Sequence, residues 1–170
     1  MKMDYLYESL LFVVLILLQV LVFNQISVFG FATPFLYIYF LVKLPMGRNV
    51  FYVIIMGFLM GFIIDMFLNT PGINAAATTL VAVLRRPLLR LFFTREEFEN
   101  FVPSIYVALG PFIRYTVLMV LIHQMVILGL EAFSLFNVNI LLLRLVASVV
   151  LTLILLFSLD SFVYKKLVSE

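Results

Sequence analysis

GFLMGFIID at residues 57–65, followed by NTPG at 69–72 and NAAA at 74–77, is the stretch that decides how this chain folds. Gly57, Gly61 and Asp65 are spaced four residues apart, so they share one face of a helix. Glycines at this spacing let a second helix approach closely in a membrane. A carboxylate inside hydrocarbon costs about 2.5–3.5 kcal/mol even on the gentlest scales. We therefore expect a tightly packed helix pair, and a partner or a purpose for Asp65.

The short connection after this helix predicts how the pair is joined. Pro71 and Gly72 occupy positions that suit a type II turn, in which the residue after the proline needs a positive φ. A tight turn there would join helices over 50–68 and 73–92 in antiparallel order. The small residues at 74–79 would then face the glycines. The pattern indicates helix pairing and says little about a ligand.

The composition places the chain in a bilayer. Of its 170 residues, 65% are hydrophobic and 12% are charged, and the mean hydropathy is +1.23. The apolar runs are continuous and do not alternate, which favours helices over strands. Because about 20 residues cross the hydrocarbon core, we predict one all-α membrane domain over 1–170. Its six spans would cover approximately 6–24, 26–43, 50–68, 73–92, 108–131 and 138–162.

The fourth span has the shortest apolar run of the six, and the distribution of charge decides whether it crosses the membrane. Its uninterrupted apolar run, 73–84, makes only about 18 Å of helix, so it could be re-entrant. If all six spans cross, one side holds nine basic residues and the other side none; otherwise the ratio is 3:6. The positive-inside rule therefore favours six crossings with both termini cytoplasmic. The nine are Lys2, Lys43, Arg48, Arg85, Arg86, Arg90, Arg95, Lys165 and Lys166.

Two neighbouring segments are expected on that cytoplasmic side. Residues 85–93 mix arginines with bulky apolar residues, which is typical of a segment lying along the headgroups. Residues 95–99 read REEFE and form the only substantial loop. This loop is either a docking site for a cytoplasmic partner or an ordinary solvated loop, and we favour the second.

Three charged residues are predicted at similar depth in the outer part of the membrane: Asp65, Glu131 and Arg144. We expect Arg144 to pair with Asp65, with Glu131 or with both, because neutralisation removes most of the cost of a buried arginine. The alternative is a proton or ion relay through Asp65, His123 and Arg144. We favour the structural role, because a relay needs polar groups through the full depth.

The sequence predicts neither a catalytic residue nor a bound cofactor or metal. It lacks nucleotide-binding and metalloprotease motifs, has no cysteine, and has a single histidine. Disulfides and a multi-histidine metal site within one chain are therefore excluded.

Three runs of sequence together resemble a known bacterial family. They are ATPFLYIYF at 32–40, the ladder, turn and alanine-rich helix at 57–77, and the segment from Arg114-Tyr115 to EAF at 131–133. With the chain length and the six expected spans, they resemble the MreD family of rod shape-determining proteins. The ladder, turn and alanine run form the family's most recognisable stretch.

The resemblance implies a function and a set of partners. Such proteins are non-catalytic scaffold or regulatory subunits of the lateral cell-wall synthesis machinery in the cell inner membrane. They bind the single-span protein MreC and work with MreB filaments and a peptidoglycan glycosyltransferase and transpeptidase pair. The family is also similar in fold to the substrate-binding subunits of energy-coupling-factor vitamin transporters. The alternative function is therefore small-molecule capture, with a vitamin held near Asp65, Glu131 and Arg144.

Overall fold

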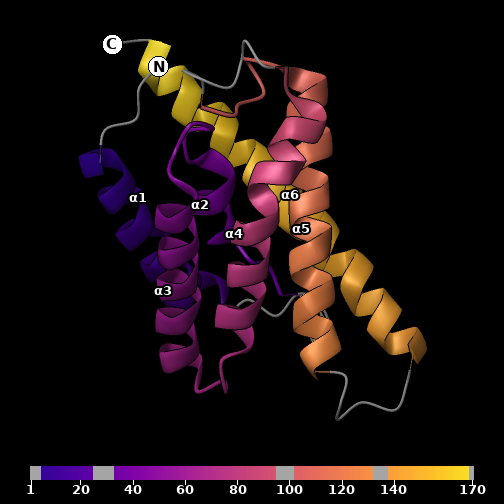
Figure 1. The fold of residues 1–170 in the computed structure, drawn as a ribbon. Coiled ribbons are helices and arrows are strands. Elements are labelled where there is room, and N and C mark those ends of the chain that lie inside the picture. Colours follow the sequence, from indigo (N-terminus) through magenta and orange to yellow (C-terminus); the bar gives the residue numbers. More distant parts are fainter. Residues whose placement is uncertain (1–4, 25–32, 95–101, 132–137, 169–170) are drawn as a thin grey trace.

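A computed structural model describes residues 5–24, 33–94, 102–131 and 138–168 of the chain, and these residues contain helices and connections but no strand. Figure 1 shows the helices running up and down one bundle. In chain order they are α1 (Tyr5–Leu18), the π-helical turn η1 (Gln19–Phe23), α2 (Ile38–Lys43), α3 (Val50–Leu68), α4 (Ile73–Phe92), α5 (Leu109–Glu131) and α6 (Val138–Val168). The predicted all-α fold is confirmed.

Among the described residues, four stretches are long and apolar enough to cross a membrane: Tyr5–Phe23, Val50–Leu68, Leu109–Glu131 and Asn139–Val163. They define a multi-pass membrane protein. Helix α4 has 20 residues, about 30 Å of helix, but three arginines in its second half lower its hydropathy. Six crossings with both termini cytoplasmic therefore stays a prediction, although the start of α1 and the end of α6 lie at the same end of the bundle (Figure 1).

The second predicted span, 26–43, is wrong as a continuous helix. Residues 26–32 lie outside the described part of the chain, as does the acidic loop 95–99. From Thr33 to Tyr37 the backbone is irregular or turning, and only the six residues Ile38–Lys43 form a helix. Pro34 supplies the physical reason, because it lacks an N–H and disfavours helical geometry in the residue before it.

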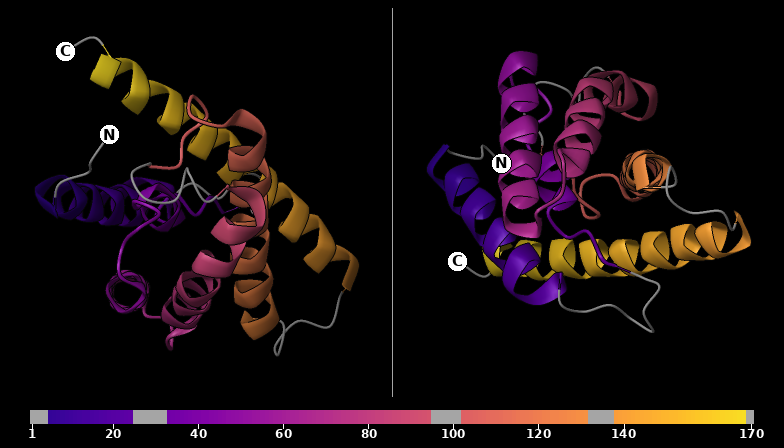
Figure 2. Two further views of the ribbon diagram at one scale, coloured as in Figure 1. Left: turned by 45° about the horizontal axis from the view of Figure 1, so that its top comes forward. Right: turned by 90° about the horizontal axis from the view of Figure 1, so that it is seen from below.

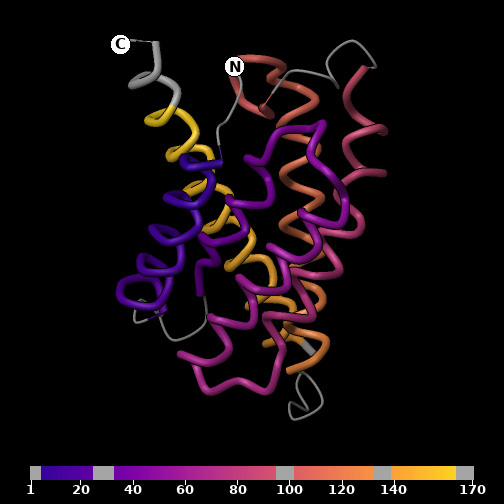
Figure 3. The backbone as a smooth tube through the Cα atoms, turned by 60° about the vertical axis from the view of Figure 1, so that its left-hand side comes forward, coloured from indigo at the N-terminus to yellow at the C-terminus, as the bar shows by residue number. Residues whose placement is uncertain are grey.

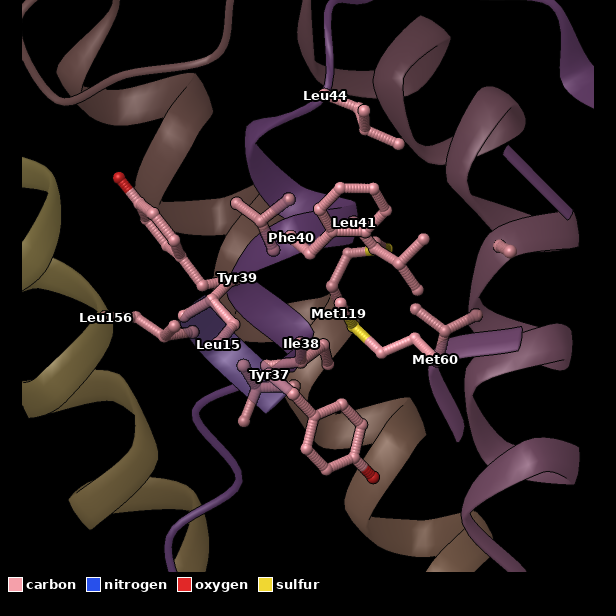
Figure 4. Packing of buried hydrophobic residues seen from close by; sticks show 14 of the residues in the cluster. Leu15, Tyr37, Ile38, Tyr39, Phe40, Leu41, Leu44, Met60, Met119 and Leu156 are labelled. Atoms are coloured by element: carbon pink, nitrogen blue, oxygen red, sulfur yellow. The ribbon is translucent and has the colours of Figure 1, made fainter. Parts of the chain in front are cut away.

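The short helix α2 forms the centre of the core. Every residue from Leu36 to Leu44 is buried, which a six-residue helix achieves only when other helices surround it. Figure 4 shows Tyr39 beside Leu15 and Leu156, while Leu41 lies toward Met60 and Met119. These neighbours come from α1, α6, α3 and α5, so α2 is enclosed by protein and not by lipid.

Helices α3 and α6 both contribute apolar surface to the outside of the bundle. Helices α3 and α4 form an antiparallel hairpin, which Figure 3 shows as adjacent tubes with a narrow turn at the bottom, and this is the most extensive helix contact. Helix α6 has 31 residues and crosses the bundle obliquely (Figure 2). Exposed side chains along α3 and α6 are mainly apolar, as a lipid-facing surface requires.

Candidate functional site: two buried polar networks

The glycines of the ladder are the points where α3 touches α4. A Cβ at Gly61 would lie 2.3 Å from Thr78 Oγ1 and 2.6 Å from Ala75 Cα. At Gly57 it would lie 3.0 Å from the Ala82 Cβ. Only glycine therefore fits at Gly61 with the two backbones at this separation. Close backbone approach of this kind is how helices associate where the hydrophobic effect contributes little.

The turn between these helices contains the two residues with positive φ in the described structure. Gly72 has φ 80° and ψ 15°, close to the values for the third residue of a type II turn. Asn69 has φ 53° and ψ 39° and ends α3 in the left-handed conformation. Pro71 lies between them, so the helix ends, reverses and restarts within four residues.

Asp65 caps the N-terminus of α4 from the neighbouring helix. Its Oδ1 accepts hydrogen bonds from the Asn74 backbone N–H at 3.1 Å, from Asn74 Nδ2 at 2.9 Å and from the Thr70 hydroxyl. Its Oδ2 accepts the Ala75 N–H at 2.8 Å. Gly72, the residue before α4, has no side chain to do this. A carboxylate here satisfies N–H groups that lack helical partners and faces the positive end of the helix dipole.

The prediction that Arg144 pairs with Asp65, with Glu131 or with both stays a prediction. Asp65 is 3% exposed, and its hydrogen-bond donors come from Thr70, Asn74 and Ala75. Arg144 on α6 exerts an electrostatic attraction on Glu131 at the end of α5. The charge in the ladder is thus stabilised by amide and hydroxyl donors nearby in sequence, and these hydrogen bonds join α3 to α4.

Beyond Asp65, the polar network continues into the centre of the bundle. The Tyr37 hydroxyl donates to Asn74 Oδ1 at 2.8 Å and lies 2.9 Å from His123 Nε2. Because the hydroxyl proton is used on Asn74, His123 Nε2 must be the donor to Tyr37. The chain Asp65–Asn74–Tyr37–His123 therefore links α3, α4, the segment before α2, and α5. It is an unsuitable proton relay, because the Asn74 amide does not titrate.

A second network holds the non-helical segment before α2. Gln19, in the π-helical turn, donates from Nε2 to the Pro34 carbonyl at 3.0 Å and accepts the Leu36 N–H at Oε1 at 2.8 Å. It is 1% exposed. One side-chain amide thus satisfies a donor and an acceptor that a helix would otherwise have paired. Backbone of this kind is tolerated at membrane depth only when protein surrounds it.

Helix α6 supports the same segment from its other side. The Thr33 N–H donates to Ser148 Oγ and the Phe35 N–H donates to Thr152 Oγ1, each at 3.2 Å. Ser148 and Thr152 are four residues apart, so they lie on one face of this helix. Their hydroxyls bind a broken backbone, a role that the spacing alone does not specify.

Arg85 closes the other end of α2. Its Nε donates to the Leu41 carbonyl at 2.7 Å, and its Nη2 donates to the carbonyls of Leu44 and Pro45. These are carbonyls at a helix C-terminus, where a cation is stabilised by the helix dipole. Arg85 is 2% exposed, so it acts as a structural cap inside the protein.

Lys43, the last residue of α2, is likewise buried. Its Nζ lies 2.5 Å from Asp160 Oδ1, with the two side chains 4% and 0% exposed. The remaining donors to Asp160 are the Tyr39 hydroxyl, the Ser104 hydroxyl and the Ile105 N–H, at 3.2, 2.8 and 2.9 Å respectively. We call these residues the Asp160 cluster. It joins α2, α6 and the segment before α5, and it completes the lone-pair positions of a buried carboxylate.

A third buried carboxylate attaches α1 to the start of α3. Glu8 is 0% exposed and accepts Arg48 Nε at 2.8 Å and the Tyr52 hydroxyl at 3.0 Å. The Arg48 guanidinium also lies over the Tyr5 ring, 4.0 Å from its centroid. The structural roles of Glu8 and Asp160 were not predicted from the sequence, because each residue lies near the end of an expected span, where charged residues are ordinary. One signal was available in the sequence: Lys43, Glu8 and Asp160 are all expected near the same end of the bundle.

These observations define the class of the protein: a multi-pass helical membrane protein whose described buried charges hold its helices together. No known protein family, curated protein or solved structure matches the chain.

Proposed function

We propose that this chain is a non-catalytic scaffold or regulatory subunit of the bacterial cell-wall elongation machinery, of the MreD kind. The observation that carries the proposal is the use of the buried ionisable groups. Asp65 caps α4, Arg85 caps α2, Asp160 binds Lys43 and Glu8 binds Arg48. Groups committed to the fold in this way suit a protein that acts by presenting a fixed surface. The ladder, turn and alanine run at 57–77, where the resemblance is strongest, hold α3 and α4 together beneath that surface.

The partner in this proposal is the single-span protein MreC, held by lateral helix packing. Helix α3 offers a suitable stripe, because five large apolar side chains on it are exposed at helical spacing: Phe51, Ile55, Phe58, Phe62 and Met66. The rings of Phe58 and Phe62 stack with centroids 5.8 Å apart. MreB and the glycosyltransferase and transpeptidase pair would then be reached through the complex in the cell inner membrane, with both termini of this chain cytoplasmic.

The test is photocrosslinking in a rod-shaped bacterial host whose own homologue has been depleted. A photoreactive residue replaces Phe51, Phe58 or Phe62 in turn, with Val150 and Ile154 on α6 as exposed apolar controls. We expect MreC to be trapped from α3 and not from α6, and we expect cells to round when the chain is withheld. Failure to trap any cell-wall component from either helix would contradict the proposal.

The alternative of a vitamin-capture subunit gains nothing from Asp65. Both of its carboxylate oxygens accept hydrogen bonds within the protein, so a ligand would have to displace the cap of α4. A vitamin carried through purification and detected by mass spectrometry would nevertheless favour that function over the scaffold.

A further inference from the structure

The outward face of α4 near its C-terminal end carries two exposed arginines. Arg86 and Arg90 are four residues apart, so they lie one above the other on the helix, and both are exposed. Pro87 and Leu91 lie beside them, and these four residues line a shallow open hollow. The preceding residue, Arg85, points inward to cap α2. Neighbouring arginines on α4 thus have different roles, because Arg85 is structural whereas Arg86 and Arg90 form an exposed surface.

Arg86 and Arg90 differ from the other arginines of this end in having no protein partner. Across the residues that the structure describes, neither forms an ion pair or a side-chain hydrogen bond, whereas Arg48 binds Glu8 and Arg85 binds carbonyls. Like charges four residues apart on a helix repel one another. The pair is therefore arranged to gain from an external anion placed between the two guanidinium groups.

The depth of the pair follows from its register against α3. Gly61 faces Thr78 and Gly57 faces Ala82, so each step along α4 moves one step back along α3. Continuing this register places Arg90 level with Asn49, which caps the start of α3. Arg86 borders the same narrow pocket as Arg48 and Val50. Because α3 is a candidate membrane span that begins here, both arginines lie where the hydrocarbon core gives way to headgroups.

We propose that Arg86 and Arg90 bind the phosphate headgroup of an anionic phospholipid from the leaflet at this end of the bundle. Guanidinium groups bind phosphate oxygens through pairs of parallel hydrogen bonds, and phosphates are the abundant anions at this depth. Pro87 and Leu91 would contact the glycerol and upper acyl region. The inference is independent of the scaffold function, because it requires only this helix face and a bilayer.

The experiment uses the full chain in detergent, with bound lipids counted by native mass spectrometry. The probe is phosphatidylglycerol, and the comparison lipid is phosphatidylcholine with the same acyl chains. We expect the wild-type chain to retain phosphatidylglycerol in preference. A basic residue near an anionic membrane surface changes binding about fivefold, so Arg86→Gln with Arg90→Gln should weaken retention roughly 25-fold.

Arg114→Gln is the matched control. Arg114 is also exposed, and its Nε donates to the Gly110 carbonyl at 3.2 Å, so its loss removes one charge from a different helix. We expect phosphatidylglycerol retention within twofold of wild type. A second variant, Arg86→Lys with Arg90→Lys, keeps the charge but loses the paired hydrogen bonds, and should give intermediate retention even if the glutamine variant folds poorly.

Several outcomes would overturn the proposal. Equal retention of phosphatidylcholine, unchanged binding in the glutamine variant, or an equal loss in Arg114→Gln would show that no headgroup site exists at α4. Complete competition by inorganic phosphate would show a site for a free anion instead of a lipid. Full wild-type retention in the lysine variant would show unspecific charge attraction.

Discussion

The α3–α4 hairpin and the segment 33–46 solve the same problem by opposite means. Both must satisfy backbone N–H and C=O groups in surroundings that offer no water. The hairpin does so locally: its helices pair their own backbone, and Asp65 caps α4 from nine residues away in sequence. The segment 33–46 relies on hydrogen-bond partners from other parts of the chain, which are Gln19, Ser148, Thr152 and Arg85. The first region should depend on residues inside it, and the second on residues in distant helices.

The largest effect is expected at the Asp160 cluster. Removing one partner of a buried ion pair leaves an uncompensated charge and costs about 3–5 kcal/mol. Lys43→Met and Asp160→Ala should each destabilise the protein by about that amount, measured as unfolding in a fixed detergent. The double variant should lose much less than the sum, because no unpaired charge remains. Additive losses would mean that the two residues stabilise the fold separately.

Gln19→Leu should give the next largest effect. The substitution leaves the Pro34 carbonyl and the Leu36 N–H buried without partners, and each unsatisfied group costs about 1–3 kcal/mol. Unfolding measurements should therefore show a loss of about 2–6 kcal/mol from a residue outside the segment. Gln124→Leu is a suitable control, because Gln124 is equally buried but its hydrogen bond to Thr152 is long, at 3.5 Å. Equal losses in the two variants would contradict the dependence of the segment on Gln19.

The same difference between local and distant partners determines how much of each region the sequence predicts. Glycine spacing, the Pro-Gly turn and the carboxylate all lie within about 20 residues, so the bounds 50–68 and 73–92 agree with the observed helices. The break before α2 depends on contacts between residues up to 117 apart in sequence, which periodicity does not report. Span 26–43 was wrong as a helix because an apolar run that contains Pro34 has the same composition whether it forms a continuous helix or a buried, broken chain. The capping of α4 by Asp65 was not predicted, because similar depth in the membrane pointed to Arg144 and Glu131 and not to the N–H groups that begin the next helix.

Gly61→Ala tests the local region and should have a smaller effect. The added Cβ would meet Ala75 Cα at 2.6 Å, so the helices must separate, and overpacking of this kind costs about 1–3 kcal/mol. Gly129→Ala is the control, because a Cβ there meets no other atom within 4 Å. Alanine is about 0.5–1 kcal/mol better than glycine inside a helix, so the control should be neutral or stabilising. A destabilising control together with a neutral Gly61→Ala would contradict the close approach of α3 and α4.

The smallest expected quantity is a coupling energy, and it separates the two candidate partners of Asp65. Residues without shared contacts have additive effects within about 0.3–0.5 kcal/mol, whereas residues in one hydrogen-bond network couple by about 0.5–3 kcal/mol. The cycle of Asp65→Asn with Arg144→Gln should therefore be additive, and the cycle of Asp65→Asn with Asn74→Ala should not, when unfolding is measured under identical conditions. Coupling to Arg144 alone would mean that a distant charge, and not the N-terminus of α4, stabilises the carboxylate. The hairpin would then depend on a residue from a distant helix, just as the segment 33–46 does.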